Sequence, residues 1–276
     1  MQTTLRETVR FDGIGIHTGA ESSIEIRPAP RDFGIAFLLD GVHVPATAEY
    51  IVKTARATAI GAQGRTVWTI EHVLSALLGM GITNAELSVT GPEVPIVDGS
   101  AKAFADAIDA VGTEVHEGLR PTLVVCEPFE LRQGDRALVL LPNAELRVRF
   151  VADFPAPIGT QYFDGVIERT FYHQEIAPAR TFGYLHEIEE LRRRGLARGG
   201  TLENALVFAP EGAMQPLHWP NEVVRHKVLD LLGDFALLGA WPQCEIIAVK
   251  SGHSLHAAAT RELRERYRDA VAVQSA

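Results

Sequence analysis

Apolar and polar positions follow two periods along this chain, and the succession of elements that they predict is similar in its two halves. Runs that alternate residue by residue predict strands, and runs with a period of about 3.6 residues predict helices. In the first half, the predicted strands cover residues 21–27, 35–39, 55–61 and 85–89. The predicted helices cover residues 69–81, with Thr69 as the N-cap, and residues 100–111.

A similar succession restarts after a turn-rich segment at residues 112–121. The predicted strands of the second half cover residues 122–131, 137–141, 146–151, 205–208 and 245–249, and its predicted helices cover residues 181–194, 221–238 and 254–267. This repetition predicts an α+β fold of two similar domains, each a β-sheet with two main helices. We place the N-terminal α+β domain at residues 1–116 and the C-terminal α+β domain at residues 117–276, with a β-α-β type insert near residues 195–208.

The helix predicted at residues 221–238 carries a polar stripe inside an apolar pattern. His226, Asp230 and Asp234 recur every four residues, so they stack on one face of the helix. Burying an imidazole and two carboxylates among leucine and valine is unfavourable unless a charge partner or a cation compensates. The stripe therefore indicates either an ion-paired structural helix or half of a metal site.

A second polar pair, Glu71 and His72, lies near the start of the helix predicted at residues 69–81. A catalytic zinc site needs three protein ligands and a carboxylate that is not a ligand to take a proton from water. His72, His226 and Asp230 supply the ligand types, and Glu71 supplies the carboxylate. Taken singly, each histidine is better explained as a partner in a hydrogen bond of the core than as a metal ligand. The structural and the metal-binding interpretation therefore both stay open.

His253 follows a glycine at the end of the strand predicted at residues 245–249. Gly252 would let the backbone approach a site closely, and a protonated imidazole there could stabilise an oxyanion or protonate a leaving amine. A surface turn with an incidental histidine is the competing reading. We expect His256 to face solvent or the other domain and not to bind a metal.

Two further patterns argue against other enzyme classes. Residues 13–19 are rich in glycine like a dinucleotide-binding loop, but their spacing differs and they lead into a strand instead of a helix. The sequence contains no Gly-x-Ser-x-Gly pattern, which argues against a serine hydrolase of the α/β type.

The composition is that of a globular protein with a substantial core, with 46% hydrophobic and 22% charged residues. A net charge of −9 argues against a nucleic acid or an anionic membrane as the partner. We find no pattern of a signal peptide or a bilayer-spanning segment, so we expect a cytoplasmic protein with at most peripheral membrane contact. Cys126 and Cys244 are both expected to be small buried hydrophobic residues.

Taken together, these residues resemble the zinc-dependent UDP-3-O-acyl-N-acetylglucosamine deacetylases of lipid A biosynthesis, the LpxC family. The resemblance covers residues 3–265 and includes Thr-Ile-Glu-His at 69–72, Arg-His-Lys-Val-Leu-Asp at 225–230 and Ser-Gly-His at 251–253. Further motifs lie at residues 13–19, 91–101 and 179–183. The resemblance implies two domains whose helix layers pack face to face, with the metal at their interface.

The resemblance also implies roles for individual residues. His72, His226 and Asp230 would bind Zn²⁺, Glu71 would be the general base, and His253 would be the cation that stabilises the oxyanion and protonates the leaving amine. Asp234 would orient His253, and Thr181 would donate its hydroxyl to the same oxyanion. The residues implied for the substrate are the cations Lys227 and Lys250, the pocket residues Phe182 and Glu187, and Tyr184, Leu185 and Ile188 along a passage for the acyl chain.

The implied reaction is hydrolysis of the acetamide of UDP-3-O-acyl-N-acetylglucosamine, giving the free amine and acetate. Its partner would be this small-molecule substrate alone, and we expect a monomer. Two alternatives stay open. One is a zinc amidase that acts on another N-acetylated sugar nucleotide, and the other is a non-catalytic protein that keeps the same fold and only binds a ligand.

Overall fold

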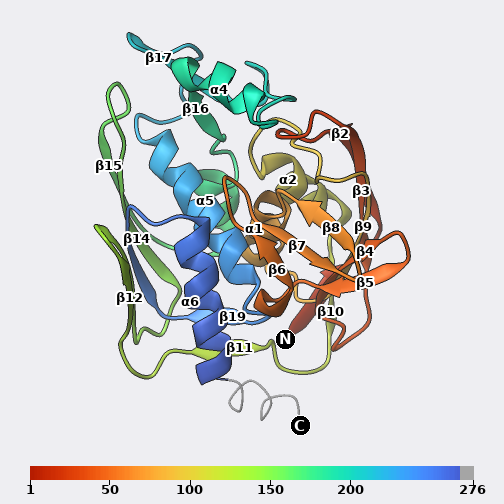
Figure 1. The fold of residues 1–276 in the computed structure, drawn as a ribbon. Helices are drawn as coiled ribbons and strands as arrows, with labels where there is room; N and C mark the ends of the chain where they lie inside the picture. The colour runs from red at the N-terminus through yellow and green to blue at the C-terminus, as the bar shows by residue number, and fades with distance from the viewer. Residues whose placement is uncertain (268–276) are drawn as a thin grey trace.

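The α+β class is confirmed in a computed structural model of the chain, which describes residues 1–267 (Figure 1). The first half forms a five-stranded sheet in the order β2-β3-β9-β4-β5. Its strands are β2 (Val9–Ile14), β3 (Glu21–Pro28), β4 (Ile35–Leu39), β5 (Val42–Pro45) and β9 (Ala85–Thr90). The second half forms a five-stranded sheet in the order β12-β13-β20-β14-β15. Its strands are β12 (Phe129–Gln133), β13 (Arg136–Leu141), β14 (Arg147–Asp153), β15 (Thr160–Val166) and β20 (Glu245–Val249).

The two sheets have the same connectivity. In each, the strand that comes last in sequence lies in the centre, antiparallel to the second strand and parallel to the third. Both sheets therefore follow one plan, as the restart of the sequence pattern predicts. The boundary between residues 116 and 117, and the treatment of the halves as two domains, stay predictions.

Five main helices accompany these sheets: α1 (Glu71–Gly79), α2 (Lys102–Val111), α4 (Ile188–Arg193), α5 (Glu222–Ala236) and α6 (His253–Arg266). Figure 1 shows α1 and α5 side by side in the middle of the molecule, with the strands of the two sheets on opposite sides. Short helical segments occur as η1 (Ala48–Tyr50), α3 (Arg169–Phe171), η2 (Tyr172–Ile176) and η3 (Leu185–Glu187). Within the described residues, no helix is both long and apolar enough to cross a membrane.

Smaller sheets complete the fold. The strands β1 (Gln2–Leu5) and β10 (Thr113–His116) form one pair, and β11 (Thr122–Val124) and β19 (Trp241–Gln243) form another. A three-stranded sheet contains β6 (Ile51–Lys53), β7 (Ala59–Ala62) and β8 (Arg65–Trp68). A second contains β16 (Phe182–Tyr184), β17 (Leu206–Ala209) and β18 (Gly212–Ala213), and its parallel pair β16 and β17 encloses α4 in a β-α-β unit.

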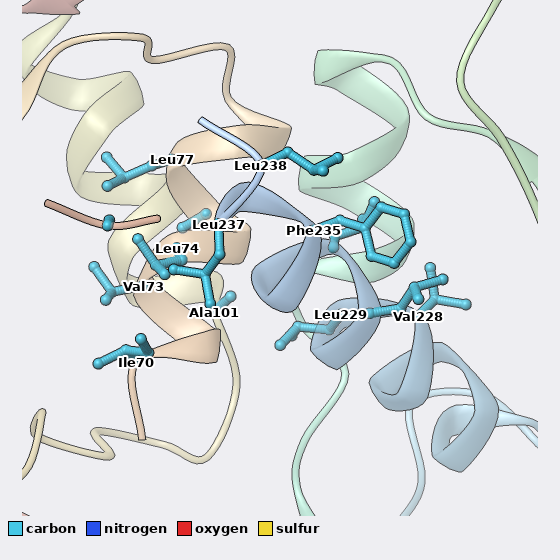
Figure 2. Packing of buried hydrophobic residues seen from close by; sticks show 14 of the residues in the cluster. Ile70, Val73, Leu74, Leu77, Ala101, Val228, Leu229, Phe235, Leu237 and Leu238 are labelled. Atoms are coloured by element: carbon cyan, nitrogen blue, oxygen red, sulfur yellow. The ribbon is translucent and has the colours of Figure 1, made fainter. Parts of the chain in front are cut away.

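The helix pair α1 and α5 lies inside one continuous hydrophobic core that includes residues of both halves. Figure 2 shows Leu74 of the first half beside Leu237, the residue that follows α5, and both side chains belong to the same core. Because α5 is buried on nearly all its sides, its polar residues are enclosed together with its apolar ones.

Close packing of α1 on α5 depends on Gly233. A Cβ atom at this position would lie 2.0 Å from the carbonyl oxygen of Glu71, which belongs to the backbone of the other helix. Any larger residue would therefore force the two helices apart. This contact brings the polar start of α1 against the polar stripe of α5.

Several predicted elements are wrong in detail. The segment at 181–194 is not one helix, because its first residues form the strand β16 and only the later residues, in η3 and α4, are helical. The strand predicted at 122–131 is divided between β11 and β12, which belong to different sheets. Of the strand predicted at 55–61, only the last residues form a strand, β7, which begins at Ala59. Cys244 is buried as expected, whereas Cys126 is exposed in the loop between β11 and β12.

The N-cap prediction for Thr69 is also wrong. The helix α1 begins at Glu71, and no side chain caps its first turn. Thr69 has a positive φ of 56°, which is unusual for a residue with a branched side chain. Its hydroxyl instead donates a hydrogen bond of 2.6 Å to the buried carboxylate of Glu93.

Candidate metal centre and active site

His72, His226 and Asp230 converge where α1 meets α5. One possible ligand atom from each residue lies within 4.8 Å of those of the other two. The two imidazole rings have centroids 5.1 Å apart, and all three residues are buried. The i, i+4 spacing of His226 and Asp230 places them on one face of α5, and the helix crossing supplies His72 from the first half.

The protonation of these residues leaves lone pairs for a cation. Burial lowers the pKa of His72 to about 3 and also lowers the pKa of His226, so both rings are neutral at physiological pH. The Nδ1 atom of His226 lies 3.0 Å from the carbonyl oxygen of Ala179, an acceptor, so Nδ1 donates and Nε2 carries the lone pair. The Nδ1 atom of His72 is buried, and no group within residues 1–267 lies in hydrogen-bonding geometry to it.

The carboxylate of Asp230 supplies the negative charge of this cluster. Burial would raise its pKa, but the positive charges of Lys227 and His253 outweigh burial and hold the pKa well below its usual range. Lys227 Nζ lies 2.6 Å from Oδ2, while Oδ1 lies 3.4 Å from His226 Nε2. Two neutral imidazoles and one carboxylate form a donor set that fits a divalent metal ion such as zinc.

Glu71 precedes His72 on α1, and one of its carboxylate oxygens lies within 4.8 Å of possible ligand atoms of Asp230 and His253. Its Oε2 atom accepts a hydrogen bond of 3.1 Å from the backbone N–H of Thr58. Burial raises the pKa of Glu71 to about 8. A carboxylate with a pKa near neutrality can both take up and release a proton, as general-base chemistry requires.

Asp234 and His253 form a buried ion pair on α5 and α6. His253 Nδ1 donates to Asp234 Oδ2 over 2.8 Å, and His253 Nε2 lies 3.9 Å from Glu71 Oε1. Burial would lower the pKa of His253, but the charge of Asp234 and this hydrogen bond raise it to about 9. Burial would also raise the pKa of Asp234, but the histidine charge and the hydrogen bonds to this carboxylate hold it below its usual range. His253 is therefore a cation at neutral pH, and it faces Glu71.

The expectation for His256 is wrong. Its ring faces neither solvent nor a distant domain surface, because it is completely buried behind His253. Its Nδ1 atom lies 2.8 Å from the same Asp234 Oδ2 atom that His253 contacts, and its Nε2 atom lies 2.8 Å from Ser251 Oγ. The i, i+3 spacing of the two histidines on α6 was the signal for this shared contact.

Thr58 is a site residue that the sequence analysis missed. It is completely buried, and its hydroxyl donates to Asp234 Oδ1 over 2.5 Å while its backbone N–H contacts Glu71. It thus connects the carboxylate that holds His253 with the carboxylate beside the metal cluster. No sequence pattern marks Thr58, because these contacts arise from the loop before β7.

A cavity of about 420 Å³ opens onto the metal cluster and His253. Thr181, predicted to act on the oxyanion, lines it, and so do the predicted substrate residues Phe182, Glu187, Ile188 and Lys227. Its apolar wall continues through Leu191 of α4, Leu202 of the segment that joins α4 to β17, and Leu206 at the start of β17. The lining of the cavity therefore combines the titratable groups of the candidate site with an apolar wall.

Three predicted substrate residues do not line this cavity. Tyr184 belongs to a separate small core and donates its hydroxyl to the carbonyl oxygen of Pro155 over 2.7 Å. Leu185 is 45% exposed. Lys250 pairs with Asp153 over 2.7 Å and lines a neighbouring polar cavity of about 340 Å³, which Lys227 also lines.

Comparisons with known proteins agree on one family. The model of a family described as UDP-3-O-acyl N-acetylglycosamine deacetylase matches residues 2–265. The chain is 41% identical over 262 residues to the UDP-3-O-acyl-N-acetylglucosamine deacetylase of Syntrophotalea carbinolica, covering 92% of this chain and 85% of the relative. It is 41% identical over 262 residues to the enzyme of the same name from Myxococcus xanthus (92% and 83% covered) and 39% identical over 274 residues to that of Phenylobacterium zucineum (96% and 94% covered).

Proposed function

The chain belongs to the family of UDP-3-O-acyl-N-acetylglucosamine deacetylases, and from this premise we propose that it hydrolyses the acetamide of UDP-3-O-acyl-N-acetylglucosamine with the help of a zinc ion. The products are acetate and the free amine, and the reaction is the committed step of lipid A biosynthesis, carried out in the cytoplasm by a monomer. The observation that carries the proposal is the convergence of His72, His226 and Asp230 beside Glu71 and His253 at the end of one cavity.

His72, His226 and Asp230 would hold the zinc ion. Three protein ligands are typical of catalytic zinc, whereas structural zinc usually has four. The buried Nδ1 atom of His72 without a partner, and the hydrogen bond that fixes the tautomer of His226, support this assignment. When bound, zinc supplies Lewis acidity, which polarises an amide carbonyl and makes water a stronger acid.

Glu71 would act as the general base. Its carboxylate takes a proton from the attacking water as the water oxygen bonds to the amide carbon. The backbone N–H of Thr58 holds Oε2, which leaves Oε1 directed toward His253 and the site. The burial that raises the pKa of Glu71 also makes its carboxylate a stronger base than an exposed one.

His253 would act as the cationic partner. Its Nδ1 proton is held by Asp234, so its Nε2 proton is the one available to the substrate. This proton stabilises the negative charge that develops on the carbonyl oxygen, together with the Thr181 hydroxyl. It then passes to the nitrogen as the carbon–nitrogen bond breaks, so that the sugar leaves as an amine and acetate remains.

The cavity would bind the rest of the substrate. Its apolar wall at Phe182, Ile188 and Leu191 suits a fatty acyl chain, and Glu187 lies beside that passage. Lys227 lines both cavities, and Lys250 lines only the polar one, so the two ammonium groups would meet the diphosphate. Tyr184, in β16, and Leu185, in η3, do not line the cavity themselves and would support the passage from behind its wall.

The test is acetate release by the purified protein from two substrates, together with its metal content. We expect about one zinc per chain, activity on UDP-3-O-acyl-N-acetylglucosamine, and at least a tenfold lower kcat/KM on UDP-N-acetylglucosamine, which lacks the acyl chain. Equal activity on both substrates would favour an amidase for another N-acetylated sugar nucleotide. Bound substrate without acetate release at full metal occupancy would favour the non-catalytic alternative.

A further inference from the structure

Two histidines of α6 share a single carboxylate oxygen. His253 Nδ1 and His256 Nδ1 each lie 2.8 Å from Asp234 Oδ2, and the Thr58 hydroxyl lies 2.5 Å from Oδ1 of the same residue. Asp234 and His256 are completely enclosed. The carboxylate therefore takes all of its hydrogen bonds from protein groups.

The donor and acceptor in each contact follow from the charge of Asp234. An ionised carboxylate only accepts hydrogen bonds, so both histidines donate through Nδ1. His256 Nε2 is then free to accept from the Ser251 hydroxyl, 2.8 Å away, and the ring is neutral. Burial lowers the pKa of His256, in agreement with this assignment.

We propose that His256 is a positioning residue for the catalytic site, which holds Asp234 Oδ2 in the one orientation that directs His253 toward Glu71 and the cavity. This inference rests on the proposed function, in which His253 Nε2 delivers a proton to the leaving nitrogen. A carboxylate oxygen has two lone pairs, and His256 occupies one of them. The remaining lone pair fixes where His253 Nδ1 lies, and hence where its Nε2–H points.

Without His256, the carboxylate would lose this constraint. Asp234 could turn about its terminal torsion, and His253 would follow it, since their hydrogen bond is the shortest polar contact of that ring. A displacement of about 1 Å in a catalytic group can lower turnover as much as about a hundredfold. His256 does not contact the cavity, so substrate binding would be unaffected.

Two substitutions separate the hydrogen bond from the volume of the ring. In His256→Asn, the amide nitrogen takes about the place of Nδ1 and can still donate to Asp234. In His256→Gln, the amide group reaches toward Ser251 instead, and the donor to Asp234 is lost. Both variants remove the aromatic ring that packs against Phe235, so a purely structural role predicts similar losses from both.

The first readout is the kinetics of the zinc-loaded enzyme. We expect His256→Gln to lower kcat about tenfold with KM within about twofold and zinc content unchanged, and His256→Asn to lose no more than about threefold. Equal loss of kcat in both variants, in proportion to a fall in melting temperature, would overturn the inference. So would wild-type kcat in His256→Gln.

The second readout does not depend on activity. In the metal-free full-length chain, the Nδ1–H proton of His253 should give a downfield NMR signal that reports its hydrogen bond to Asp234. The signal should persist in His256→Asn and shift or broaden in His256→Gln; an identical signal in both variants would contradict the inference. If wild-type protein releases no acetate while this pattern is observed, the proposed function fails and the positioning of His253 by His256 stands.

Discussion

Among single residues, three buried carboxylates of the site differ in the charges beside them. Asp230 contacts the ammonium of Lys227, and Asp234 contacts His253, so the pKa of each lies below its usual range. The imidazolium of His253 lies 3.9 Å from Glu71, beyond hydrogen-bond distance, and burial raises the pKa of Glu71 to about 8. Carboxylates whose pKa values are pushed apart in this way can take different parts in one reaction, a ligand, an orienting group and a base.

Replacing Glu71 by glutamine should lower turnover at least about a hundredfold, because the amide cannot take a proton from water. The metal content should stay near that of the wild type, since Glu71 is not among the three residues assigned as ligands. Acetate release and elemental analysis of the same preparation measure both effects. A loss of zinc from Glu71→Gln would instead make Glu71 a ligand.

His253 should make the stability of the metal-free protein depend on pH. Its pKa is about 9 in the folded state against 6.5 in the unfolded chain, so its stabilisation is complete below pH 6.5 and is lost as the pH rises through 9. A shift of this size corresponds to about 3 kcal/mol. Urea unfolding at about pH 6 and about pH 10 should show this loss relative to His253→Gln.

Asp234→Asn is the matched control for this measurement, because Asp234 is the source of the raised pKa. The variant should show little of the pH dependence that His253 adds to the wild type. If wild-type protein and His253→Gln change in parallel between the two pH values, the ion pair does not stabilise the fold.

At the scale of elements, the site depends on the crossing of α1 and α5. Gly233 allows the two backbones to touch, and Glu71 and His72 lie at that contact. The ligands on α5 are correctly spaced by the helix alone, but their distance from His72 is set by this crossing.

Gly233→Ala should therefore weaken both the fold and the metal site. Its Cβ atom would lie 2.0 Å from the Glu71 carbonyl oxygen, and because that atom belongs to the backbone, the helices would have to separate. We expect a loss of about 3 kcal/mol in the free energy of unfolding and a lower affinity for zinc. Gly183→Ala is the control, because a Cβ atom there meets nothing within 4 Å. Equal stability of the two variants would contradict the close crossing.

Predicted and observed elements agree better in some segments than in others. The strands β4 and β20 agree with the predicted residues 35–39 and 245–249, because both are short apolar runs bounded by clear breaks. The helix α5 was predicted within two residues at each end, and its polar stripe indicated the metal cluster. Local periodicity was enough to predict these segments, because their packing neighbours stabilise the same secondary structure that the local sequence favours.

Local periodicity predicts the wrong structure where a partner distant in sequence decides the conformation. Phe182 and Tyr184 fit a helical pattern, but the segment pairs with Leu206 and Phe208, more than twenty residues later. Thr69 resembles an N-cap by type and position, yet the buried carboxylate of Glu93 draws its hydroxyl away from the helix. These contacts are long-range, and no local pattern contains them.

At the scale of the whole molecule, the residues proposed to bind the metal come from both halves of the chain. His72 comes from the first half, and His226 and Asp230 come from the second. The hydrophobic core is continuous across the same boundary, so the halves are held together by packing as well as by any bound ion. A cation at this point would add its binding energy to the stability of the folded chain.

Removal of zinc should accordingly lower the melting temperature without unfolding the protein at room temperature. A ligand at about a hundred times its Kd stabilises the folded state by about 2.7 kcal/mol, which corresponds to roughly 5–10 °C for a chain of this size. Thermal melts before and after chelation, and after zinc is added back, measure the shift. His72→Ala should melt at the same temperature with and without chelator, because the first half then supplies no ligand. If chelation lowers the melting temperature of this variant as much as that of the wild type, the stabilising ion does not lie between the halves.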